Sequence, residues 1–376
     1  MSISSISASP GAVARDSVGG WGFADSRYET SYIRLGRNII NYDIDCTSSI
    51  TLFNCYVGVK HTAPSSDEAV YSYQGDVEMN NCTIKGVVNT PNGYTRAKDS
   101  LIIGKISGSI APILLTTTEI RSQDYIKIEG TSQPGFGAWI NDIKDSDDAI
   151  YQFNLTDVDY YKSMLAPEAN IDFDSLTHLA ILSDESNIEC CDGCKIYGDI
   201  INHLHYIEDY KHTINIIKSS ITGSIINRAG DTLLEQASAK TVYTLAGVTE
   251  INNSALDFIY TEKSDTRIHN HSVIRQGAIL GGQNNEILSS TINGSLKLLG
   301  QTLTMRENSV VDQVCLPSQE EARGDFIPCI TLESGSVLNA LKTHGQPCRI
   351  RIGEGATFTL LINPEIIPAN VEIIYL

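Results

Sequence analysis

Apolar, small and polar residues recur in a fixed order along the second half of the chain. Six segments show the pattern: INIIKSSITGSI (214–225), RIHNHSVIRQGAI (267–279), NEILSSTINGSL (285–296), LTMRENSVVDQV (303–314), ITLESGSVLNAL (330–341) and RIRIGEGATFTLL (349–361). The first apolar positions are Ile216, Ile268, Ile287, Met305, Leu332 and Ile352, and looser copies add Leu234 and Ile251. The small residues that follow are assigned to Ser220, Ser238, Ala255, Ser272, Thr291, Ser309, Ser336 and Ala356, with gaps of 18, 17, 17, 19, 18, 27 and 20 residues.

This spacing predicts a β-solenoid. One coil built from three short strands and three turns needs about 18–25 residues, and it must stack on its neighbours to bury its apolar face. Stacked coils lie about 4.8 Å apart, so equivalent side chains form ladders of one chemical type. The one long gap coincides with residues 315–329, which read as an inserted loop.

A second signature, small-x-apolar-x-Gly-x-apolar, runs through the earlier part of the chain. It occurs at Cys82/Gly86, Ser100/Gly104 and Cys194/Gly198, and returns at Ser219/Gly223 and Ser290/Gly294. Its alternation is typical of a strand. The glycine is expected at a bend where a β-carbon would crowd the next coil.

Residues 45–376 resemble the right-handed parallel β-helix superfamily of pectate lyases, polygalacturonases and phage tailspikes. The resemblance implies an all-β, single-stranded right-handed parallel β-helix. Residues 1–44 are expected to be a flexible leader and N-terminal cap, and a loop-rich flank is expected at about 130–180, where Pro, Gly and acidic residues concentrate. Tailspike-like relatives are trimers, which makes a homotrimer an expectation here.

Charge and composition exclude some classes of binding partner. The net charge of −18 argues against nucleic acid and against an anionic membrane, because both require a basic surface. No stretch approaches the roughly 20 apolar residues of a membrane span. The N-terminus MSISSISASPGAVARDS lacks the features of a cleavable signal peptide and resembles the leader of bacterial type III effectors. Secretion without a cleavable signal, or a place on a virion, is therefore expected. The nine cysteines read as reduced core thiols.

The segment DSDDAIYQF (145–153) is the candidate active site. Glycoside hydrolysis needs two or three carboxylates around one bond, and several β-helix glycosidases carry an Asp-Asp pair before a small and an apolar residue. That resemblance implies catalytic roles for Asp142, Asp145, Asp147 and Asp148, with sugar-binding residues at Trp139, Tyr151, Tyr160, Tyr161 and His178.

Other interpretations of the acids remain open. The Gly-His-Gly and Arg-x-Lys elements of the polygalacturonase-like family do not occur in this chain, and a strand would point Asp147 and Asp148 to opposite faces. A solvated coil corner is the simplest alternative, because Asp and Ser side chains hydrogen-bond nearby backbone in turns. A calcium site is the third.

A cysteine cluster and a histidine–arginine cluster are two further candidate binding sites. Cys190, Cys191 and Cys194 have Cys-x-x-Cys spacing but lack the second pair that zinc usually requires, unless His203 and His205 are brought near by stacking. The shared repeat position of Cys194, Cys82, Ser100 and Ser219 favours inward packing instead. Strand geometry would also place His269 and His271 on one face with Arg267, where they could bind an acidic sugar or a phosphate.

Two functions follow as expectations. The first is a polysaccharide-recognising β-helix that acts outside the producing cell without a cofactor or metal, and that would be a glycoside hydrolase or polysaccharide lyase if it cleaves its glycan. The second is a non-catalytic solenoid that binds a host protein or serves as a virion component.

Overall fold

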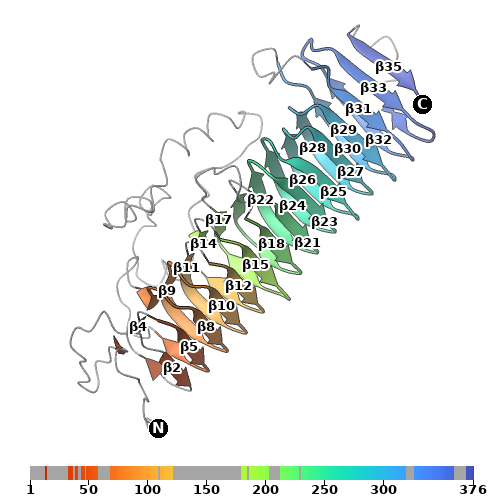
Figure 1. The fold of residues 1–376 in the computed structure, drawn as a ribbon. Coiled ribbons are helices and arrows are strands. Elements are labelled where there is room, and N and C mark those ends of the chain that lie inside the picture. Colours follow the sequence, from red (N-terminus) through yellow and green to blue (C-terminus); the bar gives the residue numbers. More distant parts are fainter. Residues whose placement is uncertain are drawn as a thin grey trace, which may run out of the picture. The chain divides into compact units, whose positions relative to one another are not determined.

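The chain folds into parallel β-strands that stack coil upon coil (Figure 1). The computed structural model describes residues 13–14, 33–36, 39–40, 44–46, 48–57, 68–108, 111–121, 179–183, 186–202, 212–227, 230–318, 326–359 and 370–376. No α-helix occurs in these ranges, and hence none that could cross a membrane. Two compact units are present: unit 1 holds residues 1–205 and 218–224, and unit 2 holds residues 206–217 and 225–376.

Unit 1 has two kinds of strand, which we assign to sheets A and B. Sheet B contains the short strands β2 (Ile33–Gly36), β5 (Ile50–Phe53), β8 (Val77–Asn80), β10 (Thr95–Lys98), β12 (Ile113–Thr116) and β15 (Ile188–Cys191). Sheet A contains β1 (Val13–Ala14), β3 (Ile39–Ile40), β4 (Ile44–Cys46), β6 (Tyr56–Val57), β7 (Glu68–Ser72), β9 (Thr83–Thr90), β11 (Leu101–Gly108), β13 (Glu119–Arg121), β14 (Leu179–Ser183), β16 (Lys195–Tyr197), β17 (Asp199–Asn202) and β19 (Ser220–Ile221). Strands β1 and β4 pair antiparallel, in contrast to the parallel pairing of β9 with β11.

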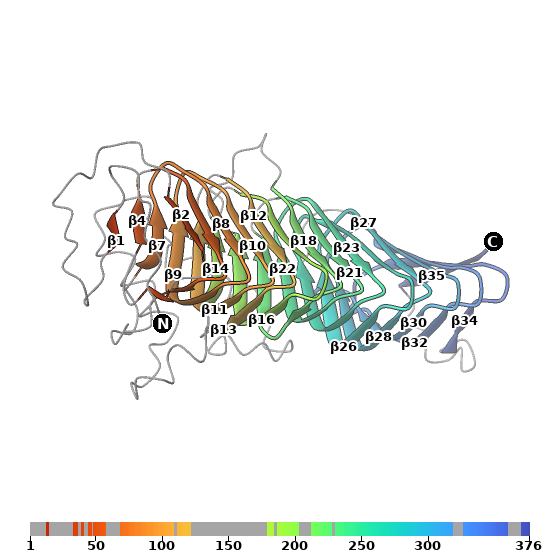
Figure 2. The same cartoon turned by 90° about the horizontal axis from the view of Figure 1, so that it is seen from below.

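Unit 2 repeats this arrangement (Figure 2). Its sheet B contains β18 (Ile214–Ile217), β21 (Thr232–Glu235), β23 (Val248–Asn252), β25 (Asp265–His269), β27 (Asn284–Leu288), β29 (Thr302–Arg306), β31 (Cys329–Leu332), β33 (Cys348–Ile352) and β35 (Val371–Tyr375). Its sheet A contains β20 (Ser224–Asn227, whose first residue belongs to unit 1), β22 (Ser238–Thr244), β24 (Ala255–Thr261), β26 (Val273–Leu280), β28 (Thr291–Leu298), β30 (Val310–Cys315), β32 (Val337–Lys342) and β34 (Thr357–Phe358). The predicted parallel β-solenoid is thereby confirmed.

The apolar ladder of unit 2 has the register that the sequence predicts. Cα partners follow one another from coil to coil through Ile216, Leu234, Ile251, Ile268, Ile287, Met305, Leu332 and Ile352. Ile352 retains 6% of its accessible surface and the others none. Because each apolar side chain covers the next, the described ladder is closed to water except at Ile352.

The number of separate strands per coil varies: the predicted three occur in β2–β3–β4, β5–β6–β7, β12–β13–β14 and β15–β16–β17, and two occur in coils such as β8–β9 and β10–β11. The second and third segments usually form one bent sheet A strand, as in β9 and β11, although β16 and β17 remain distinct around Gly198. Gly86 and Gly104 face each other at the bend, with φ of 131° and 155°. A β-carbon on Gly104 would lie 2.1 Å from the carbonyl oxygen of Gly86, so the predicted role of this glycine is confirmed.

A polar ladder follows the turn from sheet B to sheet A. We call this turn the ladder corner. Its inward residue is Ser254, Ser272, Ser290, Ser309 or Ser336 in successive coils of unit 2, and each of these is at least 96% buried. A residue with positive φ precedes it, such as Asn253 (46°) before Ser254.

The predicted small-residue ladder was wrong by one position in several coils. Thr291 pairs with Val273 and Val310, so Ser290 and not Thr291 is the neighbour of Ser272 and Ser309. Two residues of positive φ precede Ser272, Ser309 and Ser336, whereas one precedes Ser254 and Ser290. The spacing of the ladder therefore varies with the number of corner residues.

Two interruptions of the ladder coincide with long stretches of sequence between consecutive strands. Thr302 and Cys329 are Cα partners, so the additional residues of the long gap lie between β30 and β31. In unit 1, β11 pairs with both β13 and β14, and residues 122–178 lie between those two strands in the sequence.

Candidate functional site

The predicted active-site residues lie outside the described residues. This applies to the acids and to the sugar-binding set alike: Asp142, Asp145, Asp147, Asp148, Trp139, Tyr151, Tyr160, Tyr161 and His178. It also applies to His203 and His205. Their proposed roles therefore stay predictions.

The three thiols of CCDGC occupy three different environments in unit 1. Cys190 lies in the interior of sheet B as the Cα partner of Leu115, and it has no exposed surface. Cys191 faces outward, with its Sγ 3.5 Å from Thr116 Oγ1. Cys194 occupies the ladder corner, where its amide donates to Ser219 Oγ at 3.2 Å and its Sγ donates to the Cys191 carbonyl at 3.2 Å.

Burial raises the pKa of the Cys190 and Cys194 thiols, which keeps them protonated at neutral pH. The inward packing predicted for Cys194 is confirmed. Among the residues that the structure describes, no three His, Cys, Asp or Glu side chains gather closely enough to hold a metal ion.

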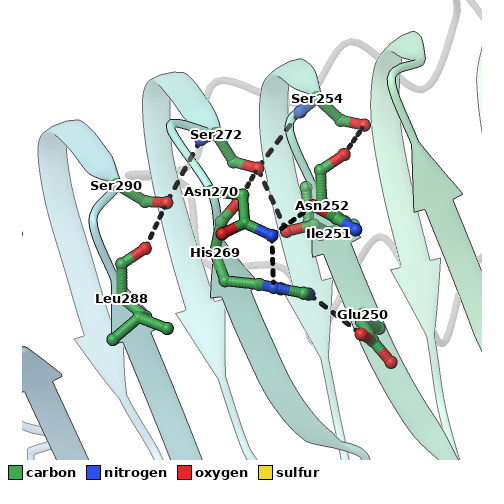
Figure 3. Close-up of polar contacts among 9 residues, drawn as sticks. All are labelled: Glu250, Ile251, Asn252, Ser254, His269, Asn270, Ser272, Leu288 and Ser290. Atoms are coloured by element: carbon green, nitrogen blue, oxygen red, sulfur yellow. Dashed lines mark hydrogen bonds and ion pairs between the residues drawn. The ribbon is translucent and has the colours of Figure 1, made fainter.

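His269 is the centre of a polar network on the outer side of unit 2 (Figure 3). Its Nε2 lies 2.9 Å from Glu250 Oε1, and its Nδ1 lies 3.3 Å from Asn270 Nδ2. The Asn270 amide also donates to Asn252 Oδ1 at 2.8 Å. In the tautomer with an unprotonated Nδ1, this nitrogen accepts from Asn270, whereas Nε2 contacts Glu250 without the geometry of a hydrogen bond.

Through Asn270 and Asn252 this network links the corners of two neighbouring coils. The predicted same-face placement is correct for Arg267 and His269, which lie two positions apart on β25 with the buried Ile268 between them. It is wrong for His271, because that residue leaves the strand and lies in the ladder corner with φ of 64°. Arg267 is exposed, with Glu250 and Glu286 as its Cα partners.

A second polar cluster lies on the outer face of sheet B in unit 1. Tyr94 Oη donates to Glu78 Oε1 at 2.7 Å. Arg96 places Nη1 3.4 Å from the same oxygen, and its guanidinium carbon lies 5.2 Å from the centre of the Tyr94 ring. The hydrogen bond to Glu78, together with partial burial, raises the pKa of Tyr94 to about 12. This arrangement holds the phenol protonated and fixes the ring beside a carboxylate and a guanidinium.

Exposed aromatic rings accompany this cluster. Phe53 at the end of β5 is 48% exposed, and Tyr73, the residue after β7, is 49% exposed. Asn92 Nδ2 donates to the Tyr73 carbonyl at 2.7 Å, which joins the turn of Tyr73 to the turn that leads to Tyr94. We define the aromatic face of unit 1 by Phe53, Tyr73, Glu78, Tyr94 and Arg96.

The sequence contained a signal for this face that motif reasoning missed. Glu78 and Arg96 are separated by 18 residues, which is the coil period, so they had to be Cα partners on adjacent strands. Tyr94 precedes Arg96 by two positions, where alternation directs both side chains outward.

Compared with protein-family models, curated proteins and solved structures, the chain matches none of them.

Proposed function

We propose that this protein binds a polysaccharide through the aromatic face of unit 1. The observation that carries the proposal is the fixed Tyr94 ring, which is held between the Glu78 carboxylate and the Arg96 guanidinium. Sugar rings present apolar C–H faces and a rim of hydroxyl groups. A flat aromatic ring supports the first, and charged hydrogen-bonding groups orient the second.

The charge of the face supports a neutral or weakly charged glycan. Glu78 and Arg96 balance each other, whereas the whole chain carries −18. A strongly anionic polymer would be repelled by the rest of the surface. Phe53 is the Cα partner of Asn80, and Tyr73 lies in the turn bonded to Asn92, so the rings are spread along the strand direction as well as over neighbouring coils. A chain of sugars, more than a single sugar, suits such a surface.

Cleavage of the bound glycan is a separate part of the proposal. It rests on Asp142, Asp145, Asp147 and Asp148, which the sequence analysis predicts to be the catalytic carboxylates. The alternative is a non-catalytic solenoid that binds a protein. It finds support in the same Tyr94–Arg96 stack, because Tyr and Arg are enriched in protein-interface hot spots.

Binding is tested with the full chain against immobilised bacterial and plant polysaccharides. We expect Tyr73→Ala and Tyr94→Ala each to weaken glycan binding about tenfold, equivalent to ~1.4 kcal/mol. Tyr375→Ala is the matched control, because Tyr375 is a 71% exposed ring in unit 2. Retention of full affinity by both unit 1 variants, or the absence of binding to every glycan, contradicts the proposal.

Cleavage is measured in the same incubations as new reducing ends or unsaturated products. Loss of product with Asp147→Asn or Asp148→Asn, without loss of binding, would assign chemistry to those acids. Binding without product in the wild-type protein leaves a glycan-binding solenoid.

A further inference from the structure

Two cysteines occupy the ladder corner in successive coils of unit 1. Tyr56 and Thr83 are Cα partners, so the residues that precede them, Cys55 and Cys82, lie one above the other. The Thr83 amide donates to the Cys55 carbonyl at 2.9 Å, which fixes this stacking. Parallel neighbours are about 4.8 Å apart, within the 4.4–6.8 Å that disulfides span between Cα atoms.

The two thiols are buried and in contact. Cys55 is 3% exposed and Cys82 is 2% exposed. The neighbouring Cys55 thiol, together with burial, raises the pKa of Cys82 above its usual range. Cys82 Sγ also donates to the Asn80 carbonyl at 3.3 Å. The resting pair is therefore a dithiol.

Sulfur is not needed for the structural role of this corner. Ser100 fills the next position of the same ladder, and its hydroxyl accepts from the Cys82 amide at 3.1 Å. Thr118 and Ser219 serve in other coils of unit 1. Among the described corners of this unit, Cys55 and Cys82 are the one pair of stacked neighbours that are both thiols.

We propose that Cys55 and Cys82 form a disulfide when the protein meets a peroxide, and that this bond cross-links two coils of unit 1. One thiolate attacks the O–O bond of the peroxide, which releases hydroxide and leaves a sulfenic acid. The second thiol attacks that sulfur, so that an S–S bond forms and water leaves. Two thiols are oxidised by two electrons, one hydrogen peroxide is reduced, and two waters result.

Burial sets the rate and the consequence of this reaction. The corner must open locally before peroxide reaches either sulfur, so oxidation follows the opening of this part of the coil. The cross-link then joins the ends of β5 and β8, and those strands carry Phe53 and Glu78 of the aromatic face. The inference does not depend on glycan binding, since it is read directly from the thiols.

The full chain is treated with hydrogen peroxide and digested without reducing agent for mass spectrometry. We expect a Cys55–Cys82 linked peptide lighter by two hydrogens than its reduced parts, and an unfolding midpoint raised by roughly 4–8 °C. Dithiothreitol should reverse both changes. Cys55→Ser and Cys82→Ser should each abolish the link and keep the fold, because Ser occupies this corner elsewhere.

Cys190 and Cys194 provide an internal comparison, because they are buried in the same unit but occupy different ladders. A digest in which Cys55 and Cys82 stay reduced or carry only sulfinic acid overturns the proposal. So does a digest in which either forms its main disulfide with another cysteine. The assay is repeated in urea below the unfolding transition, where the corner opens more often, so that slow access is not mistaken for inability.

Discussion

The backbone amide of Ser254 donates to the hydroxyl of Ser272, which lies 3.1 Å away and 18 residues further along the chain. Ser272 repeats the contact with its own amide, which donates to Ser290 Oγ at 3.1 Å. The one proton of the Ser272 hydroxyl lies within donating distance of the carbonyl groups of His269 at 2.7 Å and Ile251 at 3.0 Å. One side chain thus satisfies the backbone of two coils at the corner where sheet hydrogen bonds end.

Replacement of Ser272 should destabilise the fold in proportion to the bonds lost. Ser272→Ala leaves the Ser254 amide without its buried acceptor, and we expect a loss of about 1–3 kcal/mol in the free energy of unfolding. Ser272→Cys should cost less, because cysteine fills the same corner at Cys82. Urea denaturation measures both, with Thr304→Ala on the outer side of β29 as the control. Equal losses from the alanine and the control would refute the role given to the hydroxyl.

Gly104 should be far less replaceable than another glycine of positive φ. Gly104→Ala drives a methyl group into the Gly86 carbonyl, and we expect a cost of about 3 kcal/mol or more. Gly193 has φ of 93° with no heavy atom within 4 Å of its missing β-carbon, so Gly193→Ala should cost only about 1–2 kcal/mol. Denaturation midpoints of the two variants separate the crowding from the dihedral strain. A smaller effect at Gly104 than at Gly193 would be inconsistent with the close approach of the coils.

Two serine substitutions distinguish the thiols of CCDGC. Cys194→Ser should change stability by less than about 1 kcal/mol, since serine at this corner keeps both hydrogen bonds. Cys190→Ser places a hydroxyl in the apolar interior beside Leu115, and about 1–3 kcal/mol should be lost. Thermal unfolding of the two variants measures both changes in stability. A joint metal site would instead make the two substitutions equally damaging and sensitive to chelators.

Tyr94 should be among the last tyrosines to ionise. Its pKa of about 12 lies above the ordinary value of about 10, because the protonated phenol donates to Glu78. The bond therefore contributes stability fully below about pH 10, and this contribution is lost as pH rises toward 12. Absorbance titration of tyrosinate should lose its highest step in Tyr94→Phe. In Glu78→Gln that step should move down toward pH 10, and an unchanged curve there would assign the shift to another cause.

The apolar ladder could be predicted from the sequence because branched aliphatic residues fit only one side of a coil. Ile268 and Ile287 are fully buried, so their separation in the sequence equals the length of one coil. The small residues give weaker information. Ser289, Ser290 and Thr291 adjoin one another, and each fits equally well inside, outside or in the turn, so the pattern could not distinguish Ser290 from Thr291 as the corner residue.

The aromatic face could have been inferred only by combining two rules. Outward residues are not repeated from coil to coil, so no ladder identifies Tyr94 or Tyr73. Their proximity to Glu78 follows only after the coil period is applied to strands that already alternate. The Asp147 cluster was conspicuous because its acids are adjacent in sequence, and this property says nothing of which coil they would face.

The ladder corner also determines where such a scaffold accepts additional chain. Between β8 and β9 this junction has two residues, and the junction between β31 and β32 has four. The junctions at the sheet A bend and from sheet A to sheet B are far more permissive: 57 residues separate β13 from β14, and 13 separate β30 from β31. A graft or a tag between β13 and β14 or between β30 and β31 therefore leaves the ladder corner intact. The same addition beside Ser272 would break the hydrogen bonds that join this corner to both neighbouring coils.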